Sequence, residues 1–198
     1  MLDVNMSYQR LIDFWGVENL SRAKLEALKS IKISEKSKRF LIEIGLPREL
    51  YLFYPIKFSL EHDVFPELEL KKYLSQKIYQ KYPELKQPII IGSEDDFLGY
   101  ICIFEFAEGC VYSVGTDRGI IDRIYFMNSR VQQLAEFFFL YQNYRLKGER
   151  ENIFDDEEKY YHLIQELEYE MYRVDARVFD GEDNWWLLVL VQMYDALI

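Results

Sequence analysis

The middle of the chain predicts a β-hairpin that is apolar on both faces, and this limits the folds that the chain can adopt. Its strands are expected at residues 98–106 and 110–115, joined by a turn at Ala107-Glu108-Gly109 that pairs Phe106 with Cys110. One face is mostly aromatic or sulfur-bearing and holds Tyr100, Cys102, Phe104, Phe106, Cys110, Tyr112 and Val114. The other face holds Ile101, Ile103 and Val111. Such a sheet must be covered, at least in part, on both sides, so we expect further elements to pack around it.

Other extended segments flank this hairpin. Residues 50–58 alternate aromatic and aliphatic side chains and predict a strand or extended segment with Pro55 at an edge. Residues 89–91 predict a strand that ends at Gly92, and residues 120–127 predict another. Together these segments give a sheet of about five or six strands.

Helices are expected on both sides of the sheet segments. Residues 35–44 predict a helix with Ser34 as its N-cap and Gly45 as its stop, and residues 21–28 predict a shorter helix. Apolar side chains at helical spacing fill the last third of the chain, which is therefore expected to be helical.

Three helices are expected in that last third. The first follows Ser129-Arg130-Val131-Gln132, which has the form of a capping box, and the others span 155–174 and 185–197. The run Phe137–Phe139 is too continuous for one amphipathic stripe, so we expect the first of these helices to be buried around much of its circumference. The pair Trp185-Trp186 points two indoles about 100° apart, so one can be core while the other reaches a surface groove.

The whole chain, residues 1–198, is expected to form a single α+β domain with a mixed or antiparallel central sheet flanked by helices. No internal repeat, low-complexity tract or Gly/Ser linker divides it. No stretch approaches eighteen apolar residues, and the first ten residues include Asp3, Asn5 and Gln9, which a signal-peptide core tolerates poorly. We therefore expect a cytoplasmic protein without membrane contact.

Negative charge is concentrated in one part of the chain. Residues 1–148 carry 20 acidic and 20 basic side chains, whereas residues 149–183 carry 13 acidic against four basic ones, and Asp195 completes the net charge of −10. Such a one-sided field attracts a basic partner and repels nucleic acid. The charge pattern thus favours a protein-binding function and argues against nucleic-acid binding.

Catalytic and metal-binding motifs are not recognised in the sequence. His62 and His162 lie in no metal-binding spacing, no G-x-S-x-G occurs, and the glycines of residues 115–119 precede a strand rather than a helix. Cys102 and Cys110, about 13 Å apart in the expected register, are interpreted as small buried apolar residues. We expect no enzymatic activity, no metal and no cofactor.

Two acidic clusters each allow two interpretations. Asp155-Asp156-Glu157-Glu158 lies at a helix start, where the helix dipole stabilises acids, but it could also contact a partner. Glu94-Asp95-Asp96 is placed on a turn, as either a partner contact or a solvated loop.

An ordered set of short motifs spans residues 15–190. In chain order they are Phe40-Leu41, Gly45-Leu46-Pro47, Ile90-Ile91-Gly92, Gly99-Tyr100-Ile101-Cys102, Val111-Tyr112, Asn128-Ser129, Leu134 with Phe137 and Tyr141, and Trp185-Trp186. In this set the chain resembles the SUKH superfamily of immunity proteins, and most of all its fourth family.

The resemblance implies a non-enzymatic α+β domain that acts as a bacterial antitoxin in the cytosol. Members bind a cognate toxin, often a nuclease or another enzyme that acts on nucleic acid. The shared motifs are mainly scaffold residues and assign no toxin contacts. The acidic, tyrosine-rich segment 149–183 is longer and more charged than the family pattern leads us to expect.

The leading hypothesis is an immunity protein that occludes a basic, nuclease-type toxin stoichiometrically. Its expected contacts are the acidic residues Glu94, Asp95, Asp96, Asp155, Asp156, Glu157 and Glu158, with Tyr160, Tyr161 or Trp185 as aromatic anchors. The alternative is a regulatory scaffold that binds an endogenous protein. A small enzyme would require a compact pocket with converging polar groups, which no sequence motif predicts.

Overall fold

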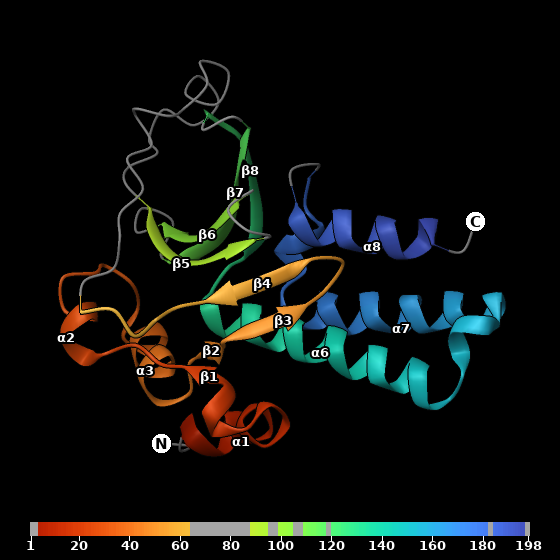
Figure 1. Ribbon diagram of the computed structural model, residues 1–198, viewed down its shortest axis with the longest axis horizontal. Coiled ribbons are helices and arrows are strands. Elements are labelled where there is room, and N and C mark those ends of the chain that lie inside the picture. Colours follow the sequence, from red (N-terminus) through yellow and green to blue (C-terminus); the bar gives the residue numbers. More distant parts are fainter. Residues whose placement is uncertain are drawn as a thin grey trace.

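A computed structural model describes residues 4–63, 88–94, 99–104, 109–117, 120–181 and 184–196 (Figure 1). These residues form six α-helices, a six-stranded sheet and a two-stranded sheet. The α+β class expected from the sequence is confirmed.

The large sheet is an antiparallel meander in which the strands follow one another in chain order. Its strands are β3 (Glu49–Tyr51), β4 (Pro55–Phe58), β5 (Ile89–Glu94), β6 (Gly99–Phe104), β7 (Cys110–Asp117) and β8 (Ile120–Asn128). The number of strands agrees with the prediction, and all pairs are antiparallel rather than mixed. Each pair joins neighbours in the chain, so register depends on local turns and bulges.

The expected hairpin forms as β6 and β7, but its register differs from the prediction. Phe104, not Phe106, pairs with Cys110, and Cys102 pairs with Tyr112. The two side-chain sets keep the predicted faces because the shift is an even number of residues. Phe106 and most of the predicted turn lie outside the described residues. Cys102 and Cys110 are both buried, and neither forms a disulfide bond.

The segment predicted as one extended stretch, 50–58, is a hairpin of β3 and β4. The turn between them, residues 52–54, is Leu-Phe-Tyr, which contains none of the usual turn residues. Pro55 is the first residue of β4 and pairs with Tyr51 of the edge strand β3. Because these three positions hold no Gly, Pro, Asn or Asp, the turn could not be recognised from the sequence.

Short elements precede the sheet. Helix α1 (Val4–Trp15) is followed by the 3₁₀ turn η1 (Val17–Asn19), β1 (Leu20–Ser21), α2 (Leu25–Leu28), α3 (Glu35–Glu43) and β2 (Leu46–Pro47). Ser34 caps α3 as predicted, because its hydroxyl accepts from the Ser37 backbone N–H at 3.1 Å. The helix predicted at 21–28 is wrong in its first half: Ser21 belongs to β1, and its hydroxyl accepts from the Leu60 backbone N–H at 2.8 Å.

Three helices complete the chain. They are α6 (Val131–Arg150), α7 (Glu157–Val174) and α8 (Trp185–Asp195), separated by the 3₁₀ turns η4 (Ile153–Asp155) and η5 (Ala176–Phe179). The predicted capping box is not formed, since Arg130 is the N-cap of α6 without a side-chain bond. Ser129 is instead bonded to Asp175, the C-cap residue of α7: its hydroxyl donates to Oδ1 at 2.9 Å and its backbone N–H donates to Oδ2 at 2.7 Å.

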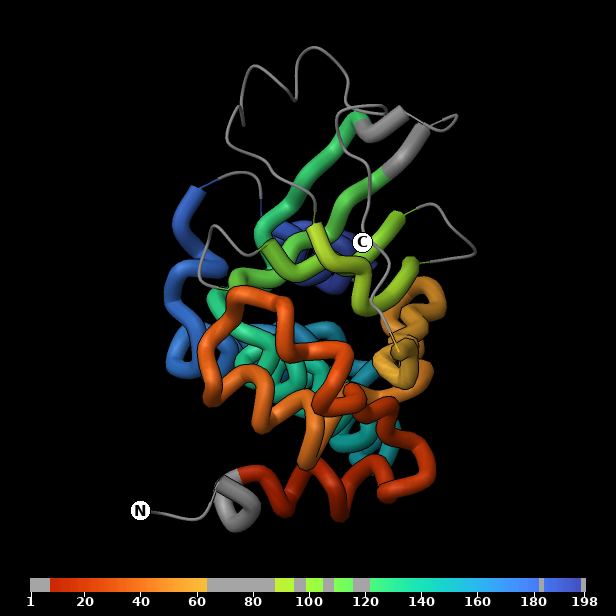
Figure 2. Tube along the Cα trace, turned by 90° about the vertical axis from the view of Figure 1, so that its left-hand side faces the viewer, coloured from red at the N-terminus to blue at the C-terminus, as the bar shows by residue number. Residues whose placement is uncertain are grey.

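The main core lies between one face of the sheet and the helices (Figure 2). Ile101, Ile103 and Val111 supply the sheet side, and α6 contributes Phe137 and Phe138, which are fully buried, whereas Phe139 of the same run is partly buried. Burial of each such aromatic side chain stabilises the fold by about 1.5–3 kcal/mol. The second face is also covered, since Cys102, Phe104 and Cys110 are buried although they lie outside this main core. The expectation that both faces are covered is confirmed.

Candidate functional site

The residues predicted to contact a partner fall into two places. Asp155 to Glu158, Tyr160 and Tyr161 lie at the start of α7, whereas Glu94 and Trp185 lie between the sheet and α8. Asp95 and Asp96 lie outside the described residues. The two places are the two candidate sites.

Asp156 holds the start of α7 in place. It is the N-cap, and its Oδ1 accepts from the Lys159 backbone N–H at 3.1 Å. Its Oδ2 lies 2.7 Å from Lys159 Nζ. These contacts with Lys159 lower the pKa of Asp156. The side chain of Asp156 is therefore committed to the helix start, as the helix-terminus interpretation proposed.

The neighbouring acids are free to face a partner. Asp155 is exposed in η4, and Glu157 and Glu158 are exposed in the first turn of α7. No ion pair within the described ranges neutralises any of these three carboxylates. With Asp156 and Tyr161, Glu157 and Glu158 line a shallow hollow. We refer to Asp155, Asp156, Glu157, Glu158 and Tyr161 as the acidic surface.

The two adjacent tyrosines differ in accessibility. Tyr160 is half-buried and packs edge-on against Phe154, with ring centroids 5.3 Å apart. Burial raises the pKa of Tyr160. Tyr161 is 44% exposed and lies against Tyr194 of α8 at 5.6 Å. Of the two, Tyr161 is the side chain placed to serve as an aromatic contact.

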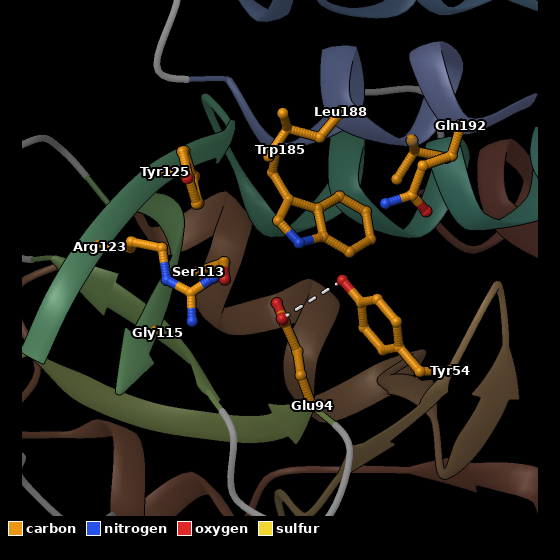
Figure 3. A pocket seen from close by; sticks show the side chains of 10 residues that line it. Tyr54, Glu94, Ser113, Gly115, Arg123, Tyr125, Trp185, Leu188 and Gln192 are labelled. Carbon is orange, nitrogen blue, oxygen red and sulfur yellow. Dashed lines mark hydrogen bonds between the residues drawn. The ribbon is translucent and has the colours of Figure 1, made fainter. Parts of the chain in front are cut away.

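A pocket of about 240 Å³ lies between the sheet and α8 (Figure 3). Its described lining combines residues of the β3–β4 turn, β5, β7, β8 and α8: Tyr54, Glu94, Ser113, Gly115, Arg123, Tyr125, Trp185, Leu188, Val189 and Gln192. This is a compact pocket with converging polar groups, which the sequence did not predict.

Glu94 was expected on a turn, as either a partner contact or part of a solvated loop, and its placement on a turn is wrong. It ends β5, where it pairs with Ile56 of β4 and Gly99 of β6, and it is only 9% exposed. The strand does not stop at Gly92 as predicted. A β-bulge between Ile90 and Gly92 shifts the register, and Ser93 and Glu94 still pair with β6. The strand therefore continues two residues past Gly92 and takes the carboxylate into the interior.

The surroundings of Glu94 disfavour its charge. Burial raises the pKa of Glu94 to about 7, and the nearby Ser113, Tyr54, Arg123 and Trp185 side chains offset this only in part. The Tyr54 hydroxyl donates to Oε2 of Glu94 over a long 3.4 Å. No described residue donates a hydrogen bond to Oε1, although that atom is buried. The carboxyl group is thus buried, one of its oxygens lacks a hydrogen-bond donor, and its pKa lies close to neutral pH.

Trp185 and Tyr54 form aromatic walls beside this carboxyl group. Their rings meet edge-on at 6.5 Å, and the indole nitrogen of Trp185 points toward Glu94 (Figure 3). Both indoles are buried in the main core, Trp186 completely and Trp185 at 3% exposed, and Trp185 also lines the pocket. The expected separation between a core indole and one in a surface groove is therefore not seen in their burial.

Four lining residues were not predicted from the sequence: Tyr54, Ser113, Arg123 and Tyr125. Ser113 and Gly115 lie on the same face as Ile101, so small side chains interrupt an otherwise apolar face. That interruption was the available signal for a hollow. The space above Gly115 holds the Arg123 side chain, whose Nε would lie 3.1 Å from a Cβ at Gly115.

Helix α8 connects the two candidate sites. Trp185 begins it at the pocket, and Tyr194, near its other end, contacts Tyr161 of the acidic surface. Nine residues of helix place these positions about 14 Å apart along the axis. Leu188 and Val191, both exposed apolar residues, lie on α8 between them.

Comparison with protein families supplies the decisive observation. The model of the SUKH-4 immunity protein family matches residues 6–192, almost the whole chain. The chain belongs to the SUKH-4 immunity protein family. Comparisons with curated proteins and with solved structures gave no match.

The SUKH-4 resemblance seen in the sequence rests largely on buried residues. Asn128 and Trp186, from two separate motifs, are hydrogen-bonded to each other at 3.0 Å. Phe137 of a third motif packs against Trp186, with ring centroids 5.1 Å apart. These motifs specify how the sheet, α6 and α8 meet, so they define the scaffold rather than a partner contact.

The pocket of this SUKH-4 protein offers a ligand the polar groups of Glu94, Ser113 and Arg123. The described lining contains no histidine, cysteine or lysine that could act with Glu94 as nucleophile or second proton-transfer group. Across the described parts of the chain, no group of three or more His, Cys, Asp and Glu is arranged to hold a metal ion. None of the described helices has the length and apolar character needed to cross a membrane.

Proposed function

We propose that this protein neutralises a cognate toxin by direct, stoichiometric binding, and that the toxin acts on nucleic acid. Membership of the SUKH-4 immunity protein family supports the immunity role. The choice of a nucleic-acid-targeting toxin rests on charge. An enzyme that acts on nucleic acid needs a basic groove for phosphates, and a chain with a net charge of −10 is complementary to such a groove.

The acidic surface is the proposed contact region. Asp155, Glu157 and Glu158 are exposed carboxylates without ion-pair partners in the described residues, so their field acts outward. Tyr161 lies among them as an exposed aromatic side chain, of a type enriched at protein interfaces. The adjacent exposed face of α8, with Val191, extends this surface by apolar area. A charged rim beside apolar area is typical of a protein-binding site.

Steric occlusion is the proposed mode of inhibition. Complementary fields accelerate encounter by 10- to 1,000-fold, and the bound protein then excludes nucleic acid from the groove. One antitoxin molecule blocks one toxin molecule without turnover, so inhibition reaches completion at a 1:1 ratio.

The primary experiment pairs the chain with the product of an adjacent toxin-like gene. Co-expression is expected to restore growth, and the purified proteins are expected to form a 1:1 complex in which the toxin no longer degrades nucleic acid. If both proteins are soluble and neither growth rescue nor a complex is observed, the proposal is wrong.

A charge-reversal variant tests the contact region. Asp155, Glu157 and Glu158 are changed to Lys, while Asp156 is kept because it caps α7. The matched control changes the exposed acids Glu18, Glu26 and Glu35 to Lys, which gives the same net charge but places the changes in η1, α2 and α3 instead of α7. The first variant should associate with the toxin at least tenfold more slowly at low salt than the control. Equal association rates for the two variants would show that the acidic surface is not part of the interface.

A further inference from the structure

The pocket beside α8 contains a carboxylate oxygen that lacks a donor. Glu94 Oε1 is buried, lines the cavity and receives no hydrogen bond from any described residue. Leaving a buried acceptor unbonded is costly, so this oxygen calls for a partner such as water, an ion or a ligand. The cavity of about 240 Å³ gives a ligand room to reach this oxygen.

The remaining lining determines which ligand fits. Trp185 and Tyr54 stand on two sides of the carboxyl group, and Tyr125 lines the same cavity (Figure 3). The indole nitrogen of Trp185 and the hydroxyl of Tyr54 point toward the carboxyl group, so the edges of these rings bound the space beside it. A carboxylate with an oxygen that lacks a donor matches a positively charged donor better than a neutral or anionic group.

Arg123 is the cationic side chain of the described lining, and its position leaves the carboxylate accessible. Its guanidinium lies over Gly115, and its Nε donates to Asp122 Oδ1 at 3.2 Å. The structure contains no ion pair between Arg123 and Glu94 among the described residues. The charge of Arg123 is thus partly balanced by Asp122, and Glu94 keeps an unfilled position for a second cation.

We propose that this pocket binds an organic cation, the ammonium or guanidinium end of a lysine- or arginine-like group, with Glu94 as counter-ion and Trp185 and Tyr54 as walls. Two sources share this chemistry: a basic side chain of a bound protein and a free small amine. The protein source rests on the proposed function, because the toxin is expected to be basic. Binding of the cation itself does not depend on that function.

A titration with small probes tests the proposal without any toxin. N-acetyl-lysinamide and N-acetyl-argininamide serve as cationic probes, and N-acetyl-norleucinamide serves as the neutral analogue of similar length. The readout is the NMR signal of the Trp185 indole N–H, assigned with Trp185→Phe. Saturable shifts at millimolar concentrations are expected for the cationic probes, with binding of the neutral analogue at least tenfold weaker.

Two variants locate the effect at Glu94. Glu94→Gln keeps the shape of the side chain and removes its charge, so the cationic probes should bind at least tenfold more weakly. Glu157→Gln, on the acidic surface, makes the same change at an exposed position and should leave probe binding unchanged. Absence of saturable shifts in the wild-type protein, or equal binding of the neutral analogue, overturns the proposal whatever the variants do.

The source of the cation is distinguished in the toxin complex. If a toxin side chain enters the pocket, Glu94→Gln should weaken the complex and bound toxin should displace N-acetyl-lysinamide. If the complex forms equally well with Glu94→Gln while the wild-type protein still binds the probe, the pocket serves a free amine. Failure of probe binding alongside intact neutralisation would refute the cation site and leave the proposed function standing.

Discussion

The Trp186 indole Nε1 donates a hydrogen bond to Oδ1 of Asn128 at 3.0 Å, across 58 residues of sequence. Both side chains are almost completely buried. Asn128 is the last residue of β8, and its Nδ2 lies 3.4 Å from Oδ2 of Asp175, the C-cap residue of α7. A single asparagine therefore connects the sheet with both α7 and α8.

Removing that asparagine should destabilise the fold measurably. Asn128→Ala leaves the buried indole N–H without its acceptor, so the free energy of unfolding should fall by about 1–3 kcal/mol. Urea denaturation followed by circular dichroism measures this change. Asn143→Ala, on the exposed side of α6, serves as control and should change stability by less than about 0.5 kcal/mol. Similar effects of the two substitutions would show that the Trp186–Asn128 bond contributes little.

Local sequence signals predicted the elements that depend on local contacts. The Ser34 cap and the two faces of the β6–β7 hairpin follow from residues a few positions apart, and both are confirmed. Ser129 shows where such signals stop. Its capping-box pattern was overridden by Asp175, a partner 46 residues away.

The pocket could not be predicted for the same reason. Its polar groups come from segments separated in the chain, and they meet only after β4 to β8 pair in one register and α8 docks beside them. The position of Glu94 depends on the bulge before Gly92, which shifts the register by one residue. The sequence shows the acidic cluster Glu94-Asp95-Asp96, but the burial of Glu94 follows from the pairing of β5 with β4 and β6.

Gly92 should tolerate no side chain. A Cβ there would lie 2.7 Å from the Lys57 carbonyl oxygen and 2.8 Å from Cδ1 of Phe58. Gly92→Ala should therefore push β4 and β5 apart and lower stability by about 1–3 kcal/mol. Thermal denaturation compares it with Gly99→Ala, where the nearest contacts of a Cβ are 3.4 Å. The idea fails if Gly92→Ala is as stable as Gly99→Ala.

Arg10 should stabilise the protein through a largely buried partner. Its Nη2 lies 2.5 Å from Oε2 of Glu136, which joins α1 to α6. Burial raises the pKa of Glu136 above its ordinary value, and the charge and hydrogen bond of Arg10 offset only part of this rise. Arg10→Ala leaves that carboxylate without its counter-ion and should cost about 1–3 kcal/mol.

A double-mutant cycle separates this pairing from general effects of removing arginine. In a Glu136→Gln background the loss on Arg10→Ala should shrink, because no buried charge remains to be compensated. Lys29→Ala, which breaks the exposed pair with Glu26, should cost less than about 0.5 kcal/mol. Equal costs of Arg10→Ala in both backgrounds would rule out the ion pair as the source of stability.

Glu94 should make stability fall as the pH rises toward neutrality. Its pKa in the folded protein is about 7, above its ordinary value of 4.5, so the native state binds the proton more tightly than the unfolded chain. Below about pH 4.5 both states are protonated and Glu94 contributes nothing. Between 4.5 and 7 the unfolded chain releases the proton first, and the native state loses up to about 3 kcal/mol relative to it.

Glu94→Gln removes this titration and isolates its contribution. The variant leaves unchanged the side chains that act on Glu94, which are Tyr54, Arg123, Ser113 and Trp185. Its stability should match the wild type near pH 4, rise above it through about pH 7, and stay parallel beyond. Urea denaturation at several pH values measures the difference, and Glu157→Gln supplies an exposed carboxylate for comparison. A stability difference that is independent of pH would mean that the pKa of Glu94 is the same in the folded and unfolded states, with its charge solvated or paired despite its burial.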